Sequence, residues 1–242
     1  MKPALVINTH SSNEECLKIF FFCMEKYIGV DYFNRVYVFA DKILNVPSYA
    51  SIIRYNDQDN YRDQMIKCLG EVNEDVILYA NEDYLFYDKA NLKKMNELLA
   101  ILERDVYSFI KFVHTDMEDY FEVRPQLFLI DKTCRNNFSQ TLSFCKTADF
   151  LNIHKNCPPS EIGAKGDTGG HLEVLAQDVC RKLNIKGLCY YNNEPKRGMV
   201  HFDSDIIPHI ASAINRGKWT TEYPKELKKI KKEYQEQYEN SK

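Results

Sequence analysis

Two adjacent carboxylates, Glu82 and Asp83, stand between two apolar stretches of the chain. Residues 76–88 read VILYANEDYLFYD, so Asn81, Glu82 and Asp83 interrupt segments that both have the composition of buried structure. Carboxylates in such a place repel each other and lose hydration unless a partner compensates them. A divalent cation is one such partner. Hard oxygen ligands suit Mg²⁺ or Mn²⁺, which would in turn hold a phosphorylated ligand. The alternative is a solvated turn in which Asp83 bonds to local backbone.

Glu173 and His201 are two further side chains whose setting could support chemistry. Glu173 follows Gly169 and Gly170 and lies in the first turn of a helix that we expect over residues 171–184. A carboxylate there either stabilises the helix dipole or acts as a general base that takes a proton from a hydroxyl group. His201 follows the last expected strands. It is either an ordinary structural or exposed histidine or a metal ligand on the far side of the site.

Arg62, Thr9 and His10 are candidates for contacts with a nucleotide. Arg62 opens a helix and could meet a phosphate or the edge of a uracil, or it could be a surface arginine. Thr9 and His10 end the first expected strand, where nucleotide contacts are common in α/β folds. The alternative for this segment is simple capping of the next helix by Ser12 and its neighbours.

Apolar strands alternate with amphipathic helices through about residue 105. Ser12–Glu15 has the spacing of a capping box, and Asp88 is expected to cap the third helix. The alternation predicts an α/β fold with an open, Rossmann-like, mostly parallel sheet flanked by helices. Ligands of such sheets bind beyond the carboxyl ends of the strands, and residues 81–83 lie at such an end. The strands are expected at 4–8, 35–40, 52–55 and 76–80, and the helices at 16–27, 61–72 and 92–102.

The second half of the chain, from about residue 106 to 224, alternates less regularly and predicts a mixed sheet. Residues 155–170 contain two prolines and four glycines and are expected to form a mobile loop over a site. Residues 225–242 form a charged helical tail whose lysines are a solvated face or, as a minor alternative, a weak contact with an anionic membrane. Strands are expected at 106–113, 126–130 and 187–191, and helices at 171–184 and 206–214.

The composition is that of a chain with one sizeable core. The 242 residues are 44% hydrophobic and carry a formal net charge of −3, which gives no global attraction to nucleic acid. No stretch approaches the roughly 18 apolar residues of a membrane span, and no export signal is visible at the amino terminus. The eight cysteines include no CxxC pair, so we expect reduced thiols in a cytoplasmic protein rather than disulfides or structural zinc.

Taken in order, these segments resemble a GT-A glycosyltransferase, of the small bacterial and phage type that acts in surface-polysaccharide synthesis. The segments that carry the resemblance are ALVINTHSS, RVYVFAD, NYRDQMIKCLGEVNEDVILYANEDYLFYD, GGHLEVLAQDV and GMVHFDSDIIPHIASAINRGKW. The resemblance implies one GT-A-like domain over residues 1–242, with a nucleotide-binding half at about 1–105 and an acceptor half at about 106–224. The implied activity is transfer of a sugar from a nucleotide-sugar, in particular a UDP-sugar, to a saccharide acceptor.

The resemblance also implies roles for individual residues. The acidic metal motif of the family, usually Asp-any-Asp, would fall on residues 81–83, where Asn81 departs from the pattern. Asp83 is then the expected ligand of Mn²⁺ or Mg²⁺, with Glu82 second and His201 as the ligand from the far side. Glu173 would be the base of an inverting enzyme.

Two other functional classes are alternatives to the glycosyltransferase, and the sequence supports one of them and argues against the other. The departure at Asn81 favours a noncatalytic protein that binds a nucleotide or a glycan on a GT-A-like scaffold. A nucleotidyltransferase would need a glycine-rich, basic phosphate loop near the amino terminus, and residues 8–13 contain no Gly, Lys or Arg.

Overall fold

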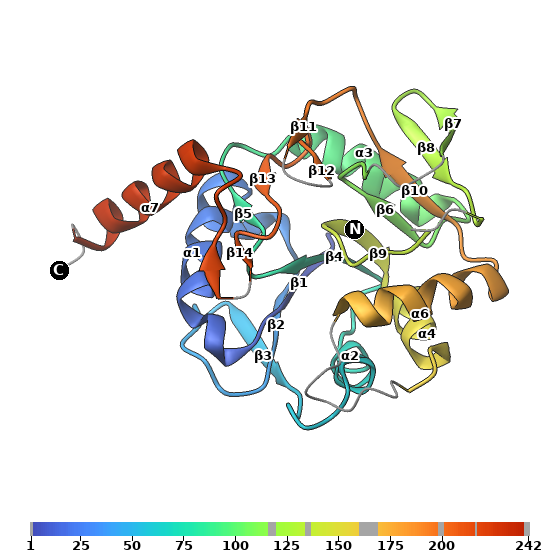
Figure 1. The fold of residues 1–242 in the computed structure, drawn as a ribbon, viewed down its shortest axis with the longest axis horizontal. Helices are drawn as coiled ribbons and strands as arrows, with labels where there is room; N and C mark the ends of the chain where they lie inside the picture. The colour runs from blue at the N-terminus through green and yellow to red at the C-terminus, as the bar shows by residue number, and fades with distance from the viewer. Residues whose placement is uncertain are drawn as a thin grey trace.

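A nine-stranded sheet in the order β3-β2-β1-β4-β9-β6-β10-β8-β7 forms the centre of the molecule (Figure 1). The computed structural model describes residues 2–115, 120–133, 137–159, 169–197, 201–215 and 217–239. The strands of the sheet are β1 (Ala4–Asn8), β2 (Val36–Ala40), β3 (Ala50–Arg54), β4 (Val76–Asn81), β6 (Phe109–Lys111), β7 (Tyr120–Arg124), β8 (Leu127–Ile130), β9 (Ser143–Lys146) and β10 (Gly187–Tyr190).

The first half of the sheet is parallel. Strands β3, β2, β1 and β4 run in the same direction, and Asn8 at the end of β1 lies opposite Asn81 at the end of β4. Strands β1 and β2 are almost entirely buried, and their near-continuous apolar sequences are typical of parallel strands with both faces covered. The carboxyl ends of these strands therefore meet at one edge of the sheet, which we call the carboxyl edge.

The second half of the sheet is mixed. Strand β9 runs antiparallel to both β4 and β6, so β6 and β10 again run in the direction of β4. Strands β8 and β7 are the last two strands of the sheet. Strand β8 runs antiparallel to β10, and β7 runs antiparallel to β8. The expected α/β class, with a mostly parallel first half and a mixed second half flanked by helices, is confirmed.

Helices cover both faces of the sheet and bury its alternating side chains in two cores. On β1, Leu5 and Ile7 belong to the core under α1, α3 and α7, whereas Ala4 and Val6 belong to the core under α2, α4 and α6. Alternation of side chains along a strand produces this division. The helices are α1 (Glu14–Tyr27), α2 (Tyr61–Leu69), α3 (Leu92–Arg104), α4 (Thr147–Asn156), α6 (Gly169–Lys182) and α7 (Pro224–Glu239).

The helix expected over residues 206–214 is wrong. The segment instead contributes β13 (His209–Ile210), which pairs antiparallel with β5 (Leu85–Phe86), and it reaches β14 (Ile214–Asn215). Pro208 is the third residue of the segment, and its ring disfavours the helical conformation for the residue before it, Ile207. Besides the 3₁₀ turns η1 (Ser11–Asn13) and η2 (Val30–Tyr32), the remaining short elements are β11 (Lys196–Arg197), β12 (His201–Phe202) and β15 (Lys218–Trp219).

Two of the expected helix caps are also wrong. Asn91, rather than Asp88, caps α3, because its side chain accepts a hydrogen bond from the backbone N–H of Lys94. The capping box expected at the start of α1 does not form, since Asn13 makes no capping hydrogen bond there. The Asn13 side chain is used instead at the carboxyl edge, where it donates to Glu82.

Helix α7 projects from the body of the molecule and carries the carboxyl terminus at its tip (Figure 1). Its first two turns are anchored, because Leu227 and Ile230 are buried in the core shared with α1. The tail is thus a packed helix rather than only a solvated one. Among the residues that the structure describes, no helix is long and apolar enough to cross a membrane. The seven described cysteines are all buried, and none of these seven is in a disulfide.

Candidate functional site

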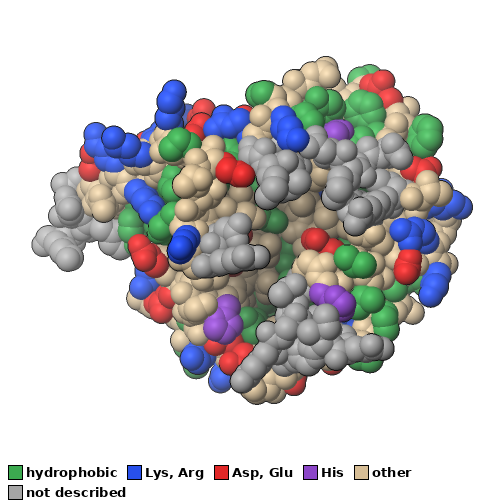
Figure 2. Space-filling model, in the orientation of Figure 1, with side chains coloured by type: hydrophobic (Ala, Val, Ile, Leu, Met, Phe, Trp, Pro, Cys, Tyr) green, Lys and Arg blue, Asp and Glu red, His purple; other side chains and the backbone are tan. Residues whose placement is uncertain are grey.

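The order of the strands places a topological switch point between β1 and β4. From β1 the chain builds outward through β2 and β3 on one side and then returns to place β4 on the other side. In open α/β sheets, ligands bind in the crevice outside such a point, at the carboxyl ends of the strands. The loops after β1 and β4, residues 9–13 and 81–84, lie at this position, and the face of the molecule in Figure 2 is hollowed near its middle, where Figure 1 has β1 and β4.

Asp41, directly after β2, holds the loop that follows β1. The backbone N–H of Ser11 donates to Asp41 Oδ1 at 2.6 Å, and the Ser11 hydroxyl donates to Asp41 Oδ2 at 2.7 Å. Burial by itself would raise the pKa of Asp41, but the hydrogen bonds from Ser11 and the nearby His10 ring outweigh it and hold the pKa below its ordinary value of 3.8. Asp41 is therefore an ionised, buried carboxylate that fixes residues 10 and 11.

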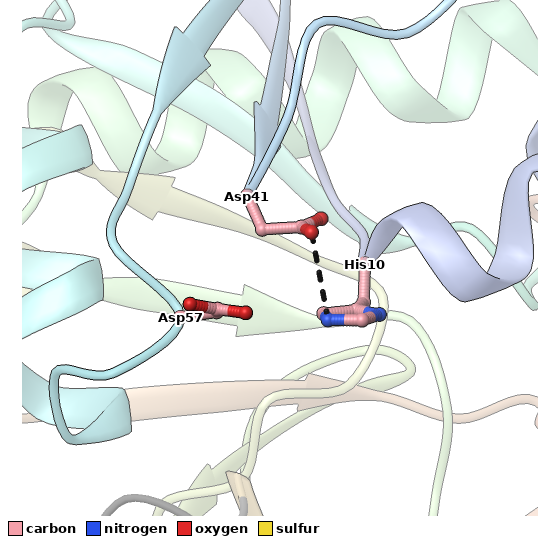
Figure 3. A group of neighbouring side chains, drawn as sticks. All are labelled: His10, Asp41 and Asp57. Atoms are coloured by element: carbon pink, nitrogen blue, oxygen red, sulfur yellow. Dashed lines mark ion pairs between the residues drawn. The ribbon is translucent and has the colours of Figure 1, made fainter.

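His10, Asp41 and Asp57 form a group that could hold a cation (Figure 3). One possible ligand atom from each residue lies within 4.8 Å of the others, and His10 Nε2 is 3.6 Å from Asp41 Oδ2. The backbone N–H of Ser12 donates to His10 Nδ1 at 3.1 Å, so the neutral ring carries its proton on Nε2, the atom that faces Asp41. A cation at Nε2 would have to displace that proton. At 3.6 Å, the His10 ring and the Asp41 carboxylate are close enough for an electrostatic contact but not for a hydrogen bond.

Glu82 is buried behind the loop after β1. Asn13 Nδ2 donates to Glu82 Oε1 at 2.5 Å, and the Thr9 side chain also bonds to this carboxylate. Burial, followed by repulsion from Asp83, raises the pKa of Glu82 from 4.5 to about 7. Thr9 and Glu82, both expected to be site residues, thus contact each other across the switch point.

Asp83 is partly buried and faces the segment that leads into β14. Its carboxylate accepts hydrogen bonds from its own backbone N–H and from that of Ile214, and its carbonyl accepts from the backbone N–H of Ala213 at 2.8 Å. Burial raises the pKa of Asp83 to about 6 in spite of these bonds. Glu82 and Asp83 are therefore two adjacent carboxyl groups that are both costly to ionise, and a nearby cation would remove that cost.

A chain of polar side chains joins the switch point to the second half of the sheet. Asn8 Nδ2 donates to the Tyr61 hydroxyl at 3.1 Å, and that hydroxyl donates to Gln140 Oε1 at 3.0 Å. On the other side, the Tyr84 hydroxyl donates to the carbonyl oxygen of Gln140 at 3.0 Å. Asn81, which replaces the first acid of the resembled motif, accepts from the Tyr79 hydroxyl at 3.1 Å.

Glu173 lies at the far end of this chain of contacts. Its Oε1 accepts a hydrogen bond from the backbone N–H of Gln140 at 2.5 Å. Burial raises the pKa of Glu173, and the Gln140 hydrogen bond and the charge of Lys111, a fully buried lysine, partly oppose the rise. The expectation that Glu173 lies in the first turn of its helix is wrong, because α6 begins at Gly169 and has no acidic residue in its first turn.

His154 and Arg62 tie α4 to the same region. Gln140 Nε2 lies 3.2 Å from His154 Nε2, while His154 Nδ1 lies 2.7 Å from the carbonyl oxygen of Phe150. An amide NH₂ can only donate, so His154 Nε2 accepts and Nδ1 carries the proton. Burial lowers the pKa of His154 to about 4. Arg62, expected to meet a nucleotide, donates to the carbonyl oxygens of His154 at 3.2 Å and Lys155 at 3.1 Å.

Two sequence-based expectations fall outside what the structure describes. The backbone of His201 is part of β12 and pairs with Arg197, but its side chain is not among those described, so its role as a metal ligand stays a prediction. The loop expected to close over the site, residues 155–170, is described only at 155–159 and 169–170.

Sequence reasoning missed Asp41, Tyr61, Lys111, Gln140 and His154 as members of the site. Asp41 had a usable signal, because an acid directly after the second strand of a Rossmann-like sheet commonly faces a ribose. The other four are brought to the site by contacts between segments that are distant in the sequence, so no local spacing of residues predicts them.

A cavity of about 740 Å³ lies at the edge of the sheet opposite the carboxyl edge, where β4 begins and β9 ends. Four acidic side chains and one lysine line it, and this excess of negative charge does not suit a phosphorylated ligand. The charged lining residues are Glu74, Asp75, Glu103, Asp149 and Lys146.

No family model and no curated protein sequence matches the chain. Among solved structures, it is similar to a CMP:2-keto-3-deoxy-manno-octonic acid synthetase complexed with CTP, with a TM-score of 0.49 and 12% identity over 78% of this chain and 89% of that one. It is also similar to residues 1–349 of S. aureus TarS, with a TM-score of 0.49 and 11% identity over 84% of this chain and 60% of that one. Similarity at this level assigns no family, so the function is argued from the site itself.

Proposed function

We propose that this protein transfers a sugar from a nucleotide-sugar, in particular a UDP-sugar, to a saccharide acceptor. The observation that carries the proposal is a pair of carboxyl groups, the buried Glu82 and the partly buried Asp83, at the topological switch point of an open α/β sheet. The switch point is where such sheets bind nucleotides. Two acids that are costly to ionise there suit a ligand that arrives with a divalent cation.

The donor nucleotide would lie along the loops after β1 and β4, against Thr9 and His10. Asp41 supports this assignment because its hydrogen bonds from Ser11 hold the first loop in place. Arg62 would contact the donor only if it left the carbonyl oxygens of α4 that it now binds.

Asp83, with His201 from the far side and Glu82 as a second carboxylate, would hold Mn²⁺ or Mg²⁺. The donor set fits a hard cation, since two of the three side chains offer carboxylate oxygens. When bound, the cation would stabilise the negative charge that develops on the diphosphate as it leaves. The burial of Glu82 and the partial burial of Asp83 would reduce the screening of their charges by water.

Glu173 would take the proton from the acceptor hydroxyl. A carboxylate that is buried, and whose pKa is raised toward the working pH, is a better base than an exposed one. The hydrogen bond from Gln140 N–H would hold Glu173 Oε1 in one orientation, and Lys111 would favour the ionised form that a base needs.

Asn81 favours one alternative, a noncatalytic protein that binds a nucleotide or glycan. Its side chain is engaged by Tyr79, so residue 81 has a structural role in place of the acid that the resemblance leads one to expect. Hydrolysis or transfer of a UDP-sugar, measured with and without Mn²⁺, separates the two functions.

The test is calorimetric titration of UDP in the presence of Mn²⁺ with wild-type protein and two variants. We expect Asp83→Asn to weaken UDP–Mn²⁺ binding by more than tenfold, because one charged ligand is lost. Asp149→Asn is the matched control, since Asp149 lines the cavity at the opposite edge of the sheet. Equal binding by wild type and Asp83→Asn would overturn the metal assignment. Weakened binding by Asp149→Asn would indicate that the nucleotide binds in the cavity that Asp149 lines.

A further inference from the structure

A second pocket, of about 450 Å³, opens at the carboxyl edge in the second half of the sheet. It lies past the ends of β6 and β10, beside the turn that joins β7 to β8. The lining residues are His114, Tyr120, Glu122, Gln126, Phe128, Tyr191, Asn192 and Asn193. None of them has a role in the nucleotide site described above.

Aromatic rings make the floor of this pocket. The His114 ring lies 4.6 Å, centroid to centroid, from the rings of Tyr120, Tyr191 and Phe202. Phe128 extends the group, with its ring 6.1 Å from that of Tyr120 and 6.5 Å from that of Tyr191. The rings of Tyr120, Phe128 and Tyr191 are only partly buried, so they offer apolar faces to a ligand that also has an apolar face.

Amide side chains form the rim and are held in place. Gln126 Nε2 donates to Asn192 Oδ1 at 2.7 Å, and Asn192 Nδ2 donates to Asp205 Oδ2 at 2.9 Å. Gln126 and Asn193 both have left-handed backbone conformations, with φ of 67° and 58°. Gln126 is the second residue of the two-residue turn Pro125–Gln126. Its left-handed conformation costs free energy that the contacts of its amide group offset. The rim is thus a fixed set of hydrogen-bonding groups.

The charge of the pocket limits what it can bind. Among its lining residues that the structure describes, Glu122 is the only carboxylate and there is no lysine or arginine. Phosphate recognition normally relies on such cations or on helix amino termini. A neutral ligand with many hydroxyl groups and one apolar face meets all of these constraints, because a hydroxyl can donate to a carboxylate and can both donate to and accept from an amide.

We infer that this pocket binds a neutral pyranose unit of the saccharide acceptor. The ring would stack on Tyr191 and its neighbours, and its hydroxyl groups would bond to Glu122, Gln126 and Asn193. The identification of the bound saccharide as the acceptor rests on the proposed function, whereas the binding of a neutral saccharide does not.

The position of the pocket makes the bound unit different from the reacting one. Strand β10 is three places from β4 in the sheet, and neighbouring strands are about 4.8 Å apart, so the pocket lies about 14 Å from the carboxylates at the end of β4. This distance exceeds the span of one sugar ring. The pocket would therefore hold a unit further along an oligosaccharide, and disaccharides or longer chains should bind better than monosaccharides.

The test is ligand-observed NMR and calorimetry with neutral mono-, di- and trisaccharides of glucose, galactose, mannose and N-acetylglucosamine. We expect at least one di- or trisaccharide to bind the wild type, and Tyr191→Ala to weaken that binding by roughly tenfold or more. Tyr191→Phe keeps the ring and should retain most of the affinity. Phe121→Ala is the matched control, because Phe121 is an exposed aromatic on β7 that points away from Tyr120 and Glu122.

Each outcome of the test bears on one proposal. If circular dichroism shows that Tyr191→Ala is unfolded, Glu122→Gln provides the test, with an expected loss of roughly threefold to tenfold. The inference is overturned if no saccharide binds, or if neither Tyr191→Ala nor Glu122→Gln changes the affinity for the saccharide. It is also overturned if Tyr191→Ala weakens UDP binding instead. Saccharide binding in a protein that fails to bind UDP–Mn²⁺ would reject the proposed function and leave this inference standing.

Discussion

Replacing Glu82 by glutamine should stabilise the protein at alkaline pH. Burial and repulsion from Asp83 raise the pKa of Glu82 from 4.5 to about 7. The folded protein therefore binds more protons than the unfolded chain between about pH 4.5 and 7, and its stability falls as the pH rises through this window. Above the folded pKa, ionised Glu82 costs about 3 kcal/mol of folding free energy, since a tenfold change in an equilibrium corresponds to about 1.4 kcal/mol.

Glutamine avoids this cost and keeps a hydrogen bond to Asn13, because its side-chain oxygen can still accept from Asn13 Nδ2, which lies 2.5 Å from Glu82 Oε1. The hydrogen bonds from Asn13 and Thr9 already contribute to the shifted pKa of Glu82, so their weakening takes nothing further from the gain. We therefore expect a net gain of about 3 kcal/mol at pH 8 and little or no gain at pH 5. For a chain of this length, that gain raises the melting temperature by about 6–12 °C.

The assay is urea unfolding of both proteins at pH 5 and pH 8, followed by circular dichroism. Comparing the difference between the two proteins removes the contribution of every other titrating group. A Glu82→Gln variant that is less stable than wild type by the same amount at both values of pH would falsify the reasoning. That result would mean that Glu82 is comfortably ionised in the folded protein, and the strongest support for a cation at the switch point would be lost.

Three further predictions concern other parts of the site and core. Glu173→Gln should leave UDP binding intact and lower sugar transfer by roughly 10²–10⁴-fold in a single-turnover assay; wild-type transfer would return Glu173 to a structural role. The low pKa of His154 means that stability falls as the pH drops from 6.5 to about 4. His154→Gln should therefore destabilise less at pH 5 than at pH 7.5 in urea titrations, and an equal loss at both would contradict a neutral buried imidazole. Gly187→Ala should cost about 1–3 kcal/mol in the same titrations, because its Cβ would lie 2.1 Å from Phe109 Cζ; a neutral effect would show that the ring can move aside.

Local patterns predicted the first half of the fold closely and parts of the second half poorly. Strands β1, β2 and β4 are long apolar runs, and their expected bounds differ from the observed ones by a residue at most. Strand β9 has four residues and is buried by its neighbours β4 and β6, so its place in the sheet depends on long-range pairing. The segment 206–214, wrongly expected to be a helix, has apolar residues at helical spacing. Pro208 disfavours the helical conformation for the residue before it.

In the site too, some residues can be predicted from local sequence and others depend on long-range contacts. Glu82 and Asp83 could be singled out because two adjacent charges between apolar segments conflict with burial, and a local conflict of this kind is typical of functional positions. Lys111 shows the opposite case. It stands in the strand segment FIKFV, where a lysine is unremarkable. Only the folded chain shows that Lys111 is fully buried and that its charge acts on Glu173 of α6.

Gln140 explains how the two halves of the site are held at a fixed separation. Its backbone N–H donates to Glu173, its carbonyl accepts from Tyr84, its side-chain oxygen accepts from Tyr61, and its side-chain nitrogen donates to His154. Tyr84 follows the carboxylates at the switch point, whereas Glu173 is on α6 in the second half. A buried polar residue with all of its groups bonded specifies one geometry, because any displacement leaves a buried donor or acceptor unpaired. The hydrogen bonds of a single loop residue, Gln140, therefore hold the separation between the nucleotide loops and the proposed base.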